Sequence, residues 1–321
     1  MQIGLHDAEK DHMKNKSFPN YALMKLSAYH KSKGNTVEWW KPKDGRHYDI
    51  VYSSKIFDFT PENPNLPEST VRGGTGYGLY GELPHEIDCQ YPDYSIYPDC
   101  DYAIGYITRG CPNRCGFCVV GIKEGDIRPY ADWRDIVRQD TKKLVLMDNN
   151  ILACEYGINQ LTELSLTDYR LDLNQGIDAR LVDNRIAEIL SKIKWLKYIR
   201  FSCDSKGQID CVINTAETLI SLGIAPSRIF VYLLVTQDVI DAAERVEQLK
   251  RLKSITIYAQ PERNIKMGVP PPTVEQKEFC GRYIYGGAWR KESWWDYCEK
   301  RKSYSKRRYV GAQAKYGVDT Q

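Results

Sequence analysis

Short apolar segments alternate with helix-length segments through the middle of this chain, and this alternation constrains the fold more than any other feature of the sequence. The expected strands are Ala103–Thr108, Leu144–Met147, Asp172–Asn174, Tyr198–Ser202, Phe230–Val235 and Ser254–Tyr258. The expected helices between them are Asp132–Lys142, Ile151–Thr162, Val182–Lys192, Cys211–Leu222 and Gln237–Leu252. Such alternation predicts an α/β fold with a parallel sheet and right-handed crossovers. We expect a partial (β/α)6 barrel of the TIM type, with its chemistry at the carboxyl ends of the strands.

The flanking segments predict a division into four parts. Residues 1–60 contain three β-rich segments and one helical segment, Pro19–Tyr29, which indicates a small Rossmann-like α/β domain. Residues 61–100 are rich in Pro, Gly and Tyr and are expected to form a linker. The barrel is assigned to residues 101–262, and residues 263–321 are assigned to an aromatic and basic helical extension with a helix over Thr273–Glu299.

Charge and hydropathy exclude several classes of protein. Lys and Arg number 45 against 42 Asp and Glu, so a net charge of +3 does not indicate a polyanion-binding surface over the whole molecule. No window approaches the roughly 18 to 20 apolar residues needed to cross a bilayer, so no membrane association is expected. Met1–Asp11 lacks a basic segment followed by an apolar run, and a cytoplasmic location is therefore expected.

The C-terminal segment Lys300–Arg308 has six basic residues in nine. Such a tail allows contact with nucleic-acid phosphates, and the aromatic residues before it allow stacking on bases. A terminal basic segment is more commonly a solvated helix end, however, so nucleic acid is the weaker interpretation.

Three of the ten cysteines are crowded into one short segment, Cys111, Cys115 and Cys118, with the spacing C-x-x-x-C-x-x-C. Disulfides are rare in the cytoplasm, so this cluster indicates a metal. Three thiolates would leave one iron of a cubane cluster open to a substrate or cofactor. A structural zinc site needs four ligands, for which Cys89 or Cys100 could supply a fourth thiolate.

The segment Thr108–Val120, TRGCPNRCGFCVV, resembles the signature loop of the radical S-adenosylmethionine (radical SAM) superfamily. The resemblance includes the aromatic residue before the last cysteine, Phe117, which it places among the cofactor-binding residues. It implies that Cys111, Cys115 and Cys118 bind a 4Fe-4S cluster, whose open iron chelates S-adenosylmethionine. It also implies reductive cleavage to a 5'-deoxyadenosyl radical that abstracts hydrogen from a substrate, which the sequence does not identify.

The resemblance also implies further cofactor contacts after later strands. The second expected barrel strand ends in Asp148, Asn149 and Asn150, and the fourth leads to Ser202 and Asp204. These polar groups could hold the amino group or the ribose of S-adenosylmethionine. Asp and Asn after strands are also common as helix caps and turn formers, and this alternative stays open.

The N-terminal layer is similar to that of relatives with a cobalamin-binding domain. The histidines His6, His12, His30 and His47 do not occur in the D-x-H-x-x-G pattern of such domains, so a scaffold role is favoured over cobalamin binding. A reductant such as flavodoxin or ferredoxin is the partner that the family requires. The alternative function is a non-catalytic iron-sulfur or zinc protein in electron transfer or regulation.

Overall fold

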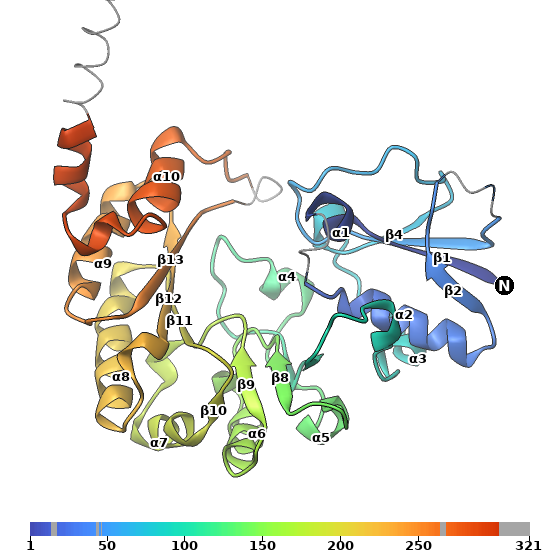
Figure 1. Ribbon diagram of the computed structural model, residues 1–321, viewed down its shortest axis with the longest axis horizontal. Coiled ribbons are helices and arrows are strands. Elements are labelled where there is room, and N and C mark those ends of the chain that lie inside the picture. Colours follow the sequence, from blue (N-terminus) through green and yellow to red (C-terminus); the bar gives the residue numbers. More distant parts are fainter. Residues whose placement is uncertain (14–17, 43–44, 46, 264–267, 302–321) are drawn as a thin grey trace, which may run out of the picture. The chain divides into compact units, whose positions relative to one another are not determined.

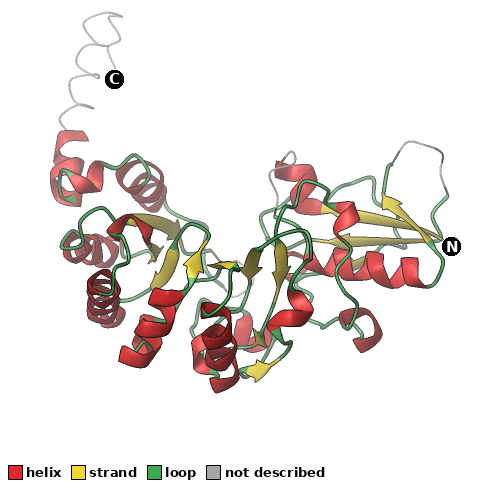
Figure 2. Ribbon diagram, turned by 60° about the horizontal axis from the view of Figure 1, so that its bottom comes forward, coloured by secondary structure: helices red, strands yellow, loops and turns green. Residues whose placement is uncertain are grey.

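The computed structural model describes residues 1–13, 18–42, 45, 47–263 and 268–301. Within these residues the chain divides into two compact units. Unit 1 comprises Met1–Ile177, Asp183–Lys197 and residues 268–270, and unit 2 comprises Asp178–Val182, Tyr198–Arg263 and residues 271–301. Figure 1 labels their helices and strands, and Figure 2 shows the same elements coloured by type.

Unit 1 begins with a four-stranded parallel sheet. Its strands are β1 (Gln2–Asp7), β2 (Thr36–Trp39), β3 (Ile50–Ser54) and β4 (Val71–Gly73), in the order β2-β1-β3-β4. Helix α1 (Ala8–Met13) follows β1, and α2 (Tyr21–Ser32) connects to β2. Helix α2 begins where the Asn20 side-chain oxygen accepts a hydrogen bond from the Leu23 backbone N–H, which satisfies a donor that the first turn leaves unpaired.

The segment between residues 61 and 100 contributes to this sheet. Strand β4 pairs with β3, and a short helix, α3 (His85–Asp88), follows. The side chain of Tyr97 packs in the core of unit 1 and its hydroxyl donates to Asp7 Oδ2 at 2.6 Å. Parts of the segment expected as a linker are therefore built into the first layer, and the boundary at residue 60 stays a prediction.

A second parallel sheet of unit 1 positions the cysteines. Its order is β10-β9-β8-β5. The strands are β5 (Ala103–Gly105), β8 (Lys143–Leu146), β9 (Arg170–Leu173) and β10 (Lys194–Trp195), and the helices are α5 (Trp133–Ile136), α6 (Glu155–Ser165) and α7 (Asn184–Lys192). Leu144, Val145 and Leu146 are all buried, as expected for a strand covered on both faces.

Unit 2 is built on a three-stranded parallel sheet in the order β11-β12-β13. Its strands are β11 (Ile199–Cys203), β12 (Ile229–Val235) and β13 (Thr256–Pro261), and α8 (Ile209–Ser221) and α9 (Val239–Leu249) lie beside them in Figure 1. Burial alternates along β12, where every second residue from Ile229 to Val235 is buried and the residues between are half-buried. One face of this sheet is therefore buried in the core of unit 2, and the side chains of the other face are only half-buried along β12.

The expected α/β class with parallel strands is confirmed. The described strands fall into separate sheets of four, four, three and two, so a continuous (β/α)6 barrel and a Rossmann-like domain are not confirmed. The helix expected over Asp132–Lys142 is reduced to α5, because the backbone is extended at Val137 and the Arg138 guanidinium instead donates to the Cys100 and Tyr102 carbonyls.

The expected helix over Thr273–Glu299 is interrupted. It consists of α10 (Val274–Glu278), a π-helical turn over Phe279–Ile284, a 3-10 turn over Ala288–Arg290 and a further helix over residues 294–301. Gly287 breaks it with a φ of 76°, in the left-handed region that glycine tolerates. Trp289 and Trp294 are buried, so they pack in the core of this region. Of the basic tail, only Lys300 and Arg301 lie within the described residues.

Helices that could traverse a bilayer, judged by length and apolar character, are not found in the described residues.

Candidate metal centre

The three cysteines lie on a loop whose two ends are held together by protein contacts. We call residues 110–125 the cysteine loop. It is flanked by β6 (Thr108–Arg109) and β7 (Arg128–Pro129), which pair antiparallel, and it contains the short helix α4 (Val120–Lys123). Beside this pair, the Cys111 N–H donates to the Gly125 carbonyl at 3.2 Å. The loop therefore follows β5 on the carboxyl side and returns to the point where it began.

Glu124 ties the base of the cysteine loop to its first residues. Its carboxylate accepts from Arg109 Nε and Nη2, both at 2.9 Å, and from the Gly110 N–H at 3.0 Å. The side chains of Arg109 and Glu124 are 14% and 5% exposed, so the pair is largely shielded from water. Burial favours a neutral Glu124, but the Arg109 hydrogen bonds and charge outweigh it and lower the pKa of Glu124.

Gly110 allows the close approach on which this closure depends. Its φ of 84° lies in the left-handed region, which disfavours side chains with a Cβ atom. A Cβ atom there would lie 2.2 Å from the Asp126 carbonyl oxygen. Only glycine fits where the two ends of the loop meet.

Asp148 holds the strand that leads into the cysteine loop. Its carboxylate accepts from the backbone N–H groups of Ile107 and Thr108, and from the Thr108 hydroxyl at 2.7 Å. Asp148 is 5% exposed, and burial, the largest effect, raises the pKa of Asp148 to about 6 against these hydrogen bonds. The structure thus uses this expected cofactor residue to position the chain beside the loop.

Asn149 and Asn150 also contact the cysteine loop. Asn149 Nδ2 donates to Glu124 Oε2 at 2.9 Å, and Asn150 Nδ2 lies 3.7 Å from the sulfur of Cys111. The Asn150 amide is thus a hydrogen-bond donor to the first sulfur of the loop. The three residues after β8 therefore act together on the loop, whereas their contact with S-adenosylmethionine stays a prediction.

The thiol groups of the loop do not form a compact site for one ion. Cys111, Cys115 and Cys118 are half-buried, and a backbone bond from Cys118 N–H to the Cys115 carbonyl makes a turn between two of them. Phe117 between them is half-buried. No group of three His, Cys, Asp or Glu side chains in the described part of the chain converges on a single metal position. Three thiolates are the donor set that a cubane cluster with one open iron would use.

The two cysteines considered as a fourth ligand are located elsewhere. Cys100 is buried before the start of β5, and its thiol donates to the Tyr102 carbonyl at 3.4 Å. Cys89 is exposed at the end of α3, with its thiol on the Glu86 carbonyl. The cysteine loop follows the opposite, carboxyl end of β5 from Cys100. The ten cysteines all lie among the described residues and form no disulfide.

Ser202 and Asp204 belong to unit 2, at the carboxyl end of β11. Burial is the largest effect on Asp204 and raises its pKa to about 6. The Asp178 charge acts in the same direction, and the charges of Arg245 and Arg180 oppose it. Arg245 is fully buried and fixes this end of the sheet, because its guanidinium donates to the Cys203 and Leu234 carbonyls and to Asp241. Asp204 thus lies in a polar, low-dielectric environment that is suited to hydrogen bonding.

Both ring nitrogens of the two buried histidines of the N-terminal sheet contact protein groups. His6 bonds Ser53 Oγ at 2.8 Å through Nδ1 and Asp11 through Nε2. His30 bonds the Tyr52 hydroxyl and the Asn35 amide. These bonds are consistent with a structural role for both rings, while cobalamin binding stays an untested alternative.

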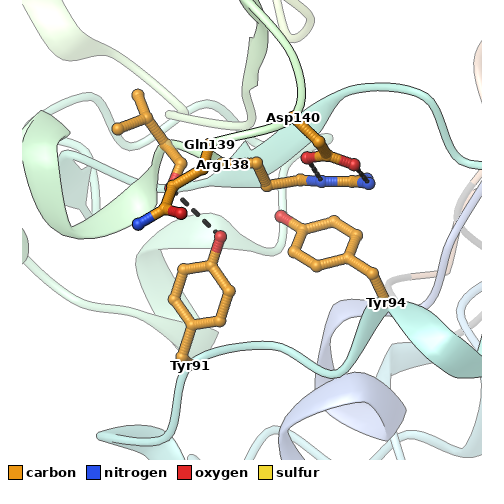
Figure 3. Close-up of a pocket in the computed structure, with 6 residues that line it drawn as sticks. Tyr91, Tyr94, Arg138, Gln139 and Asp140 are labelled. Atoms are coloured by element: carbon orange, nitrogen blue, oxygen red, sulfur yellow. Dashed lines mark hydrogen bonds and ion pairs between the residues drawn. The ribbon is translucent and has the colours of Figure 1, made fainter.

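A surface cavity of about 430 Å³ lies at the other end of the second sheet (Figure 3). Tyr91, Tyr94 and Arg138 are among its lining residues, and Arg138 precedes the start of β8. The guanidinium of Arg138 is bound to Asp140 and stacks on Tyr94 at 4.2 Å, and the Tyr91 hydroxyl donates to the Val137 carbonyl. We do not place the candidate metal centre at this cavity. The three cysteines follow the carboxyl end of β5, whereas the cavity lies at the other end of the sheet.

The sequence did not single out Arg109 and Glu124. In the sequence they are two opposite charges, 15 residues apart, with the three cysteines between them. Such a separation has no helical or strand periodicity, so only the folded loop reveals the pair.

Compared with models of protein families and with curated proteins, the chain matches none significantly.

Proposed function

We propose that this protein is a radical SAM enzyme, in which Cys111, Cys115 and Cys118 bind a 4Fe-4S cluster used to cleave S-adenosylmethionine reductively. The observation behind it is an anchored loop after β5 with three half-buried cysteines. When bound, the cluster and S-adenosylmethionine would supply a 5'-deoxyadenosyl radical. The substrate is not assigned.

The chain's own residues would act by positioning. Glu124, Arg109 and Gly110 would keep the two ends of the loop together, so that the segment that carries the three thiols stays anchored at its base. Asn150 would donate to the Cys111 thiolate, and Asp148 would hold the strand before the loop. Such preorganisation lowers the cost of binding a charged group, because the protein dipoles are already oriented.

The proposal includes the fold expected from the sequence, a partial (β/α)6 barrel preceded by a Rossmann-like layer. It is supported by parallel pairing in each of the three larger sheets. A soluble reductant such as flavodoxin or ferredoxin would provide the electron, and a cytoplasmic location would suit an oxygen-sensitive cluster.

The test is anaerobic reconstitution of the full-length chain with iron and sulfide, followed by dithionite and S-adenosylmethionine. We expect about four irons per chain and 5'-deoxyadenosine detectable by mass spectrometry. Replacing Cys111, Cys115 and Cys118 by Ala should abolish both. The matched control is Cys89→Ala, an exposed cysteine outside the loop, which should change neither.

The outcomes separate the two candidate functions. Iron that is bound and reduced, with no product even when candidate substrates are added, would favour a non-catalytic iron-sulfur protein. Zinc in place of iron, or product formation by the triple Ala variant, would overturn the proposal.

A further inference from the structure

One face of the sheet in unit 2 has the composition of a ligand site. The residues of β11, β12 and β13 that alternate with the buried ones form three rows across the strands. The register pairs Arg200 with Phe230 in the first row and Leu234 with Gln260 in the third. In the middle row, Tyr232 lies between Ser202 and Tyr258. The opposite face holds buried side chains such as Phe201, Val231 and Ile257. We call the first of these the aromatic face.

The rings of the aromatic face lie in mutual contact. Phe230 is 5.0 Å from Tyr232 and 6.2 Å from Tyr258, measured between ring centroids, and Tyr232 is 6.1 Å from Tyr258. Tyr198, just before β11, lies 5.0 Å from Phe230. Tyr258 is 43% exposed, so at least one ring of this group presents a surface to solvent.

A cation lies among these rings. The Arg200 guanidinium carbon lies 5.7 Å from the Phe230 centroid and 5.8 Å from that of Tyr198. Burial lowers the pKa of Arg200, and Tyr232 partly offsets this. An anion that approached Arg200 would be attracted strongly, because a partly buried charge is poorly screened by water.

This composition differs from that of a face that only packs. A parallel sheet covered on both faces by protein has strands that are almost continuously aliphatic, like Leu144–Leu146 of β8. The aromatic face instead combines rings with a guanidinium, the Ser202 hydroxyl and the exposed Gln260 amide. Apolar rings with a few convergent polar groups are typical of small-molecule sites.

We infer that the aromatic face binds a planar, anionic ligand of the nucleotide class, with its ring stacked on Tyr258 and its phosphate at Arg200. The Tyr232 ring lies at 84° to that of Tyr258, so it would contact the edge of the bound ring. The rings provide flat apolar surface for stacking on a base, which is worth roughly 1 to 3 kcal/mol per base. The guanidinium provides a forked donor matched to phosphate. Ser202 and Gln260 lie in adjacent rows and could bond polar edges of the base or ribose. This inference does not depend on the iron-sulfur proposal.

The experiment is isothermal titration calorimetry on the full-length chain with AMP, GMP, CMP and UMP, each compared with its nucleoside and with inorganic phosphate. We expect at least one nucleotide to bind, and its nucleoside to bind at least about tenfold more weakly, since Arg200 is the phosphate partner. Tyr258→Ala should weaken nucleotide binding roughly 5- to 100-fold through lost stacking. Arg200→Met should weaken nucleotide binding without affecting the nucleoside.

Matched controls come from the same unit. Tyr285→Ala removes an 82% exposed tyrosine, and Arg251→Met removes an exposed arginine, so both should bind like the unaltered protein. Arg200→Lys, which retains the charge, is the second variant if Arg200→Met does not fold. The inference is overturned if none of the nucleotides binds, if nucleotide and nucleoside bind equally, or if Tyr258→Ala and the Arg200 variants bind like the controls.

Discussion

Arg109 and Glu124 join the two ends of the cysteine loop through two parallel hydrogen bonds of 2.9 Å. Arg109 also stacks on Tyr106, 4.3 Å from the ring centroid. The pair therefore fixes the loop to the body of unit 1 as well as closing it. The thiols are presented by a segment whose base is held by a shielded ion pair.

Replacing Glu124 with Ala should destabilise the protein strongly. The change would leave the Arg109 charge shielded and uncompensated, for which a cost of roughly 3 to 5 kcal/mol is typical. Urea unfolding followed by circular dichroism would measure it. Glu82→Ala is the matched control, because Glu82 pairs with Arg128 at an exposed position where an ion pair contributes roughly 0 to 1 kcal/mol. Equal losses in the two variants would contradict the role assigned to Glu124.

Substituting Gly110 with Ala should disrupt the base of the loop. The added Cβ would meet the Asp126 carbonyl at 2.2 Å, and the left-handed backbone would be strained by roughly 1 to 3 kcal/mol. Gly116→Ala lies in the same loop, and nothing lies within 4 Å of its added Cβ. We expect a lower melting temperature and lower iron content after reconstitution for Gly110→Ala, with both values unchanged for Gly116→Ala.

The rate of alkylation should differ between exposed and buried cysteines. With iodoacetamide at pH 8, Cys89 and the three half-buried cysteines of the loop should react, and Cys100 and Cys203 should react at least about tenfold more slowly. Burial raises the pKa of Cys203 to about 11 and also raises that of Cys100. Peptide mass spectrometry would give the rate at each site. After reconstitution with iron and sulfide, the loop cysteines should become protected while Cys89 still reacts, and unchanged loop reactivity would count against a cluster.

The stability of unit 2 should depend on pH through Asp204. The pKa of Asp204 is raised from 3.8 to about 6, so its favourable contribution is fully present below pH 3.8 and is lost as the pH rises through 6. Asp204→Asn should therefore stabilise the protein at pH 7, by at most roughly 3 kcal/mol, and change it little at pH 4. Thermal unfolding from pH 4 to 7.5 would test this, with Glu217→Gln, an exposed carboxylate on α8, as the control. A pH-independent difference would contradict this assignment.

Much of the secondary structure could be predicted because local apolar runs identify buried strands. The runs Phe230–Val235 and Leu144–Met147 correspond closely to β12 and β8. The helix expected at Val182–Lys192 is α7, and Asp183 caps it through a bond from the Ile186 N–H. Such caps and periodic patterns are properties of short sequence windows.

The remaining features depend on contacts between distant residues. The division of the strands into separate sheets depends on pairing, which the apolar character of each strand does not encode. The contacts of Asp148 with Ile107 and Thr108 span about 40 residues. The rows of the aromatic face require the register between β11, β12 and β13. For the same reason, the positions of the three cysteines could be read from the sequence, but the groups that hold their loop could not.

The closure of the cysteine loop has a consequence for the order of events in maturation. Its contacts at Gly110, Glu124 and Gly125 are made entirely between protein groups, so none of them needs a bound metal as a partner. Under the proposed function, a newly synthesised chain would present its thiols to an iron-sulfur assembly system on a loop that is already closed. Loading of the proposed cluster would then follow folding of the polypeptide.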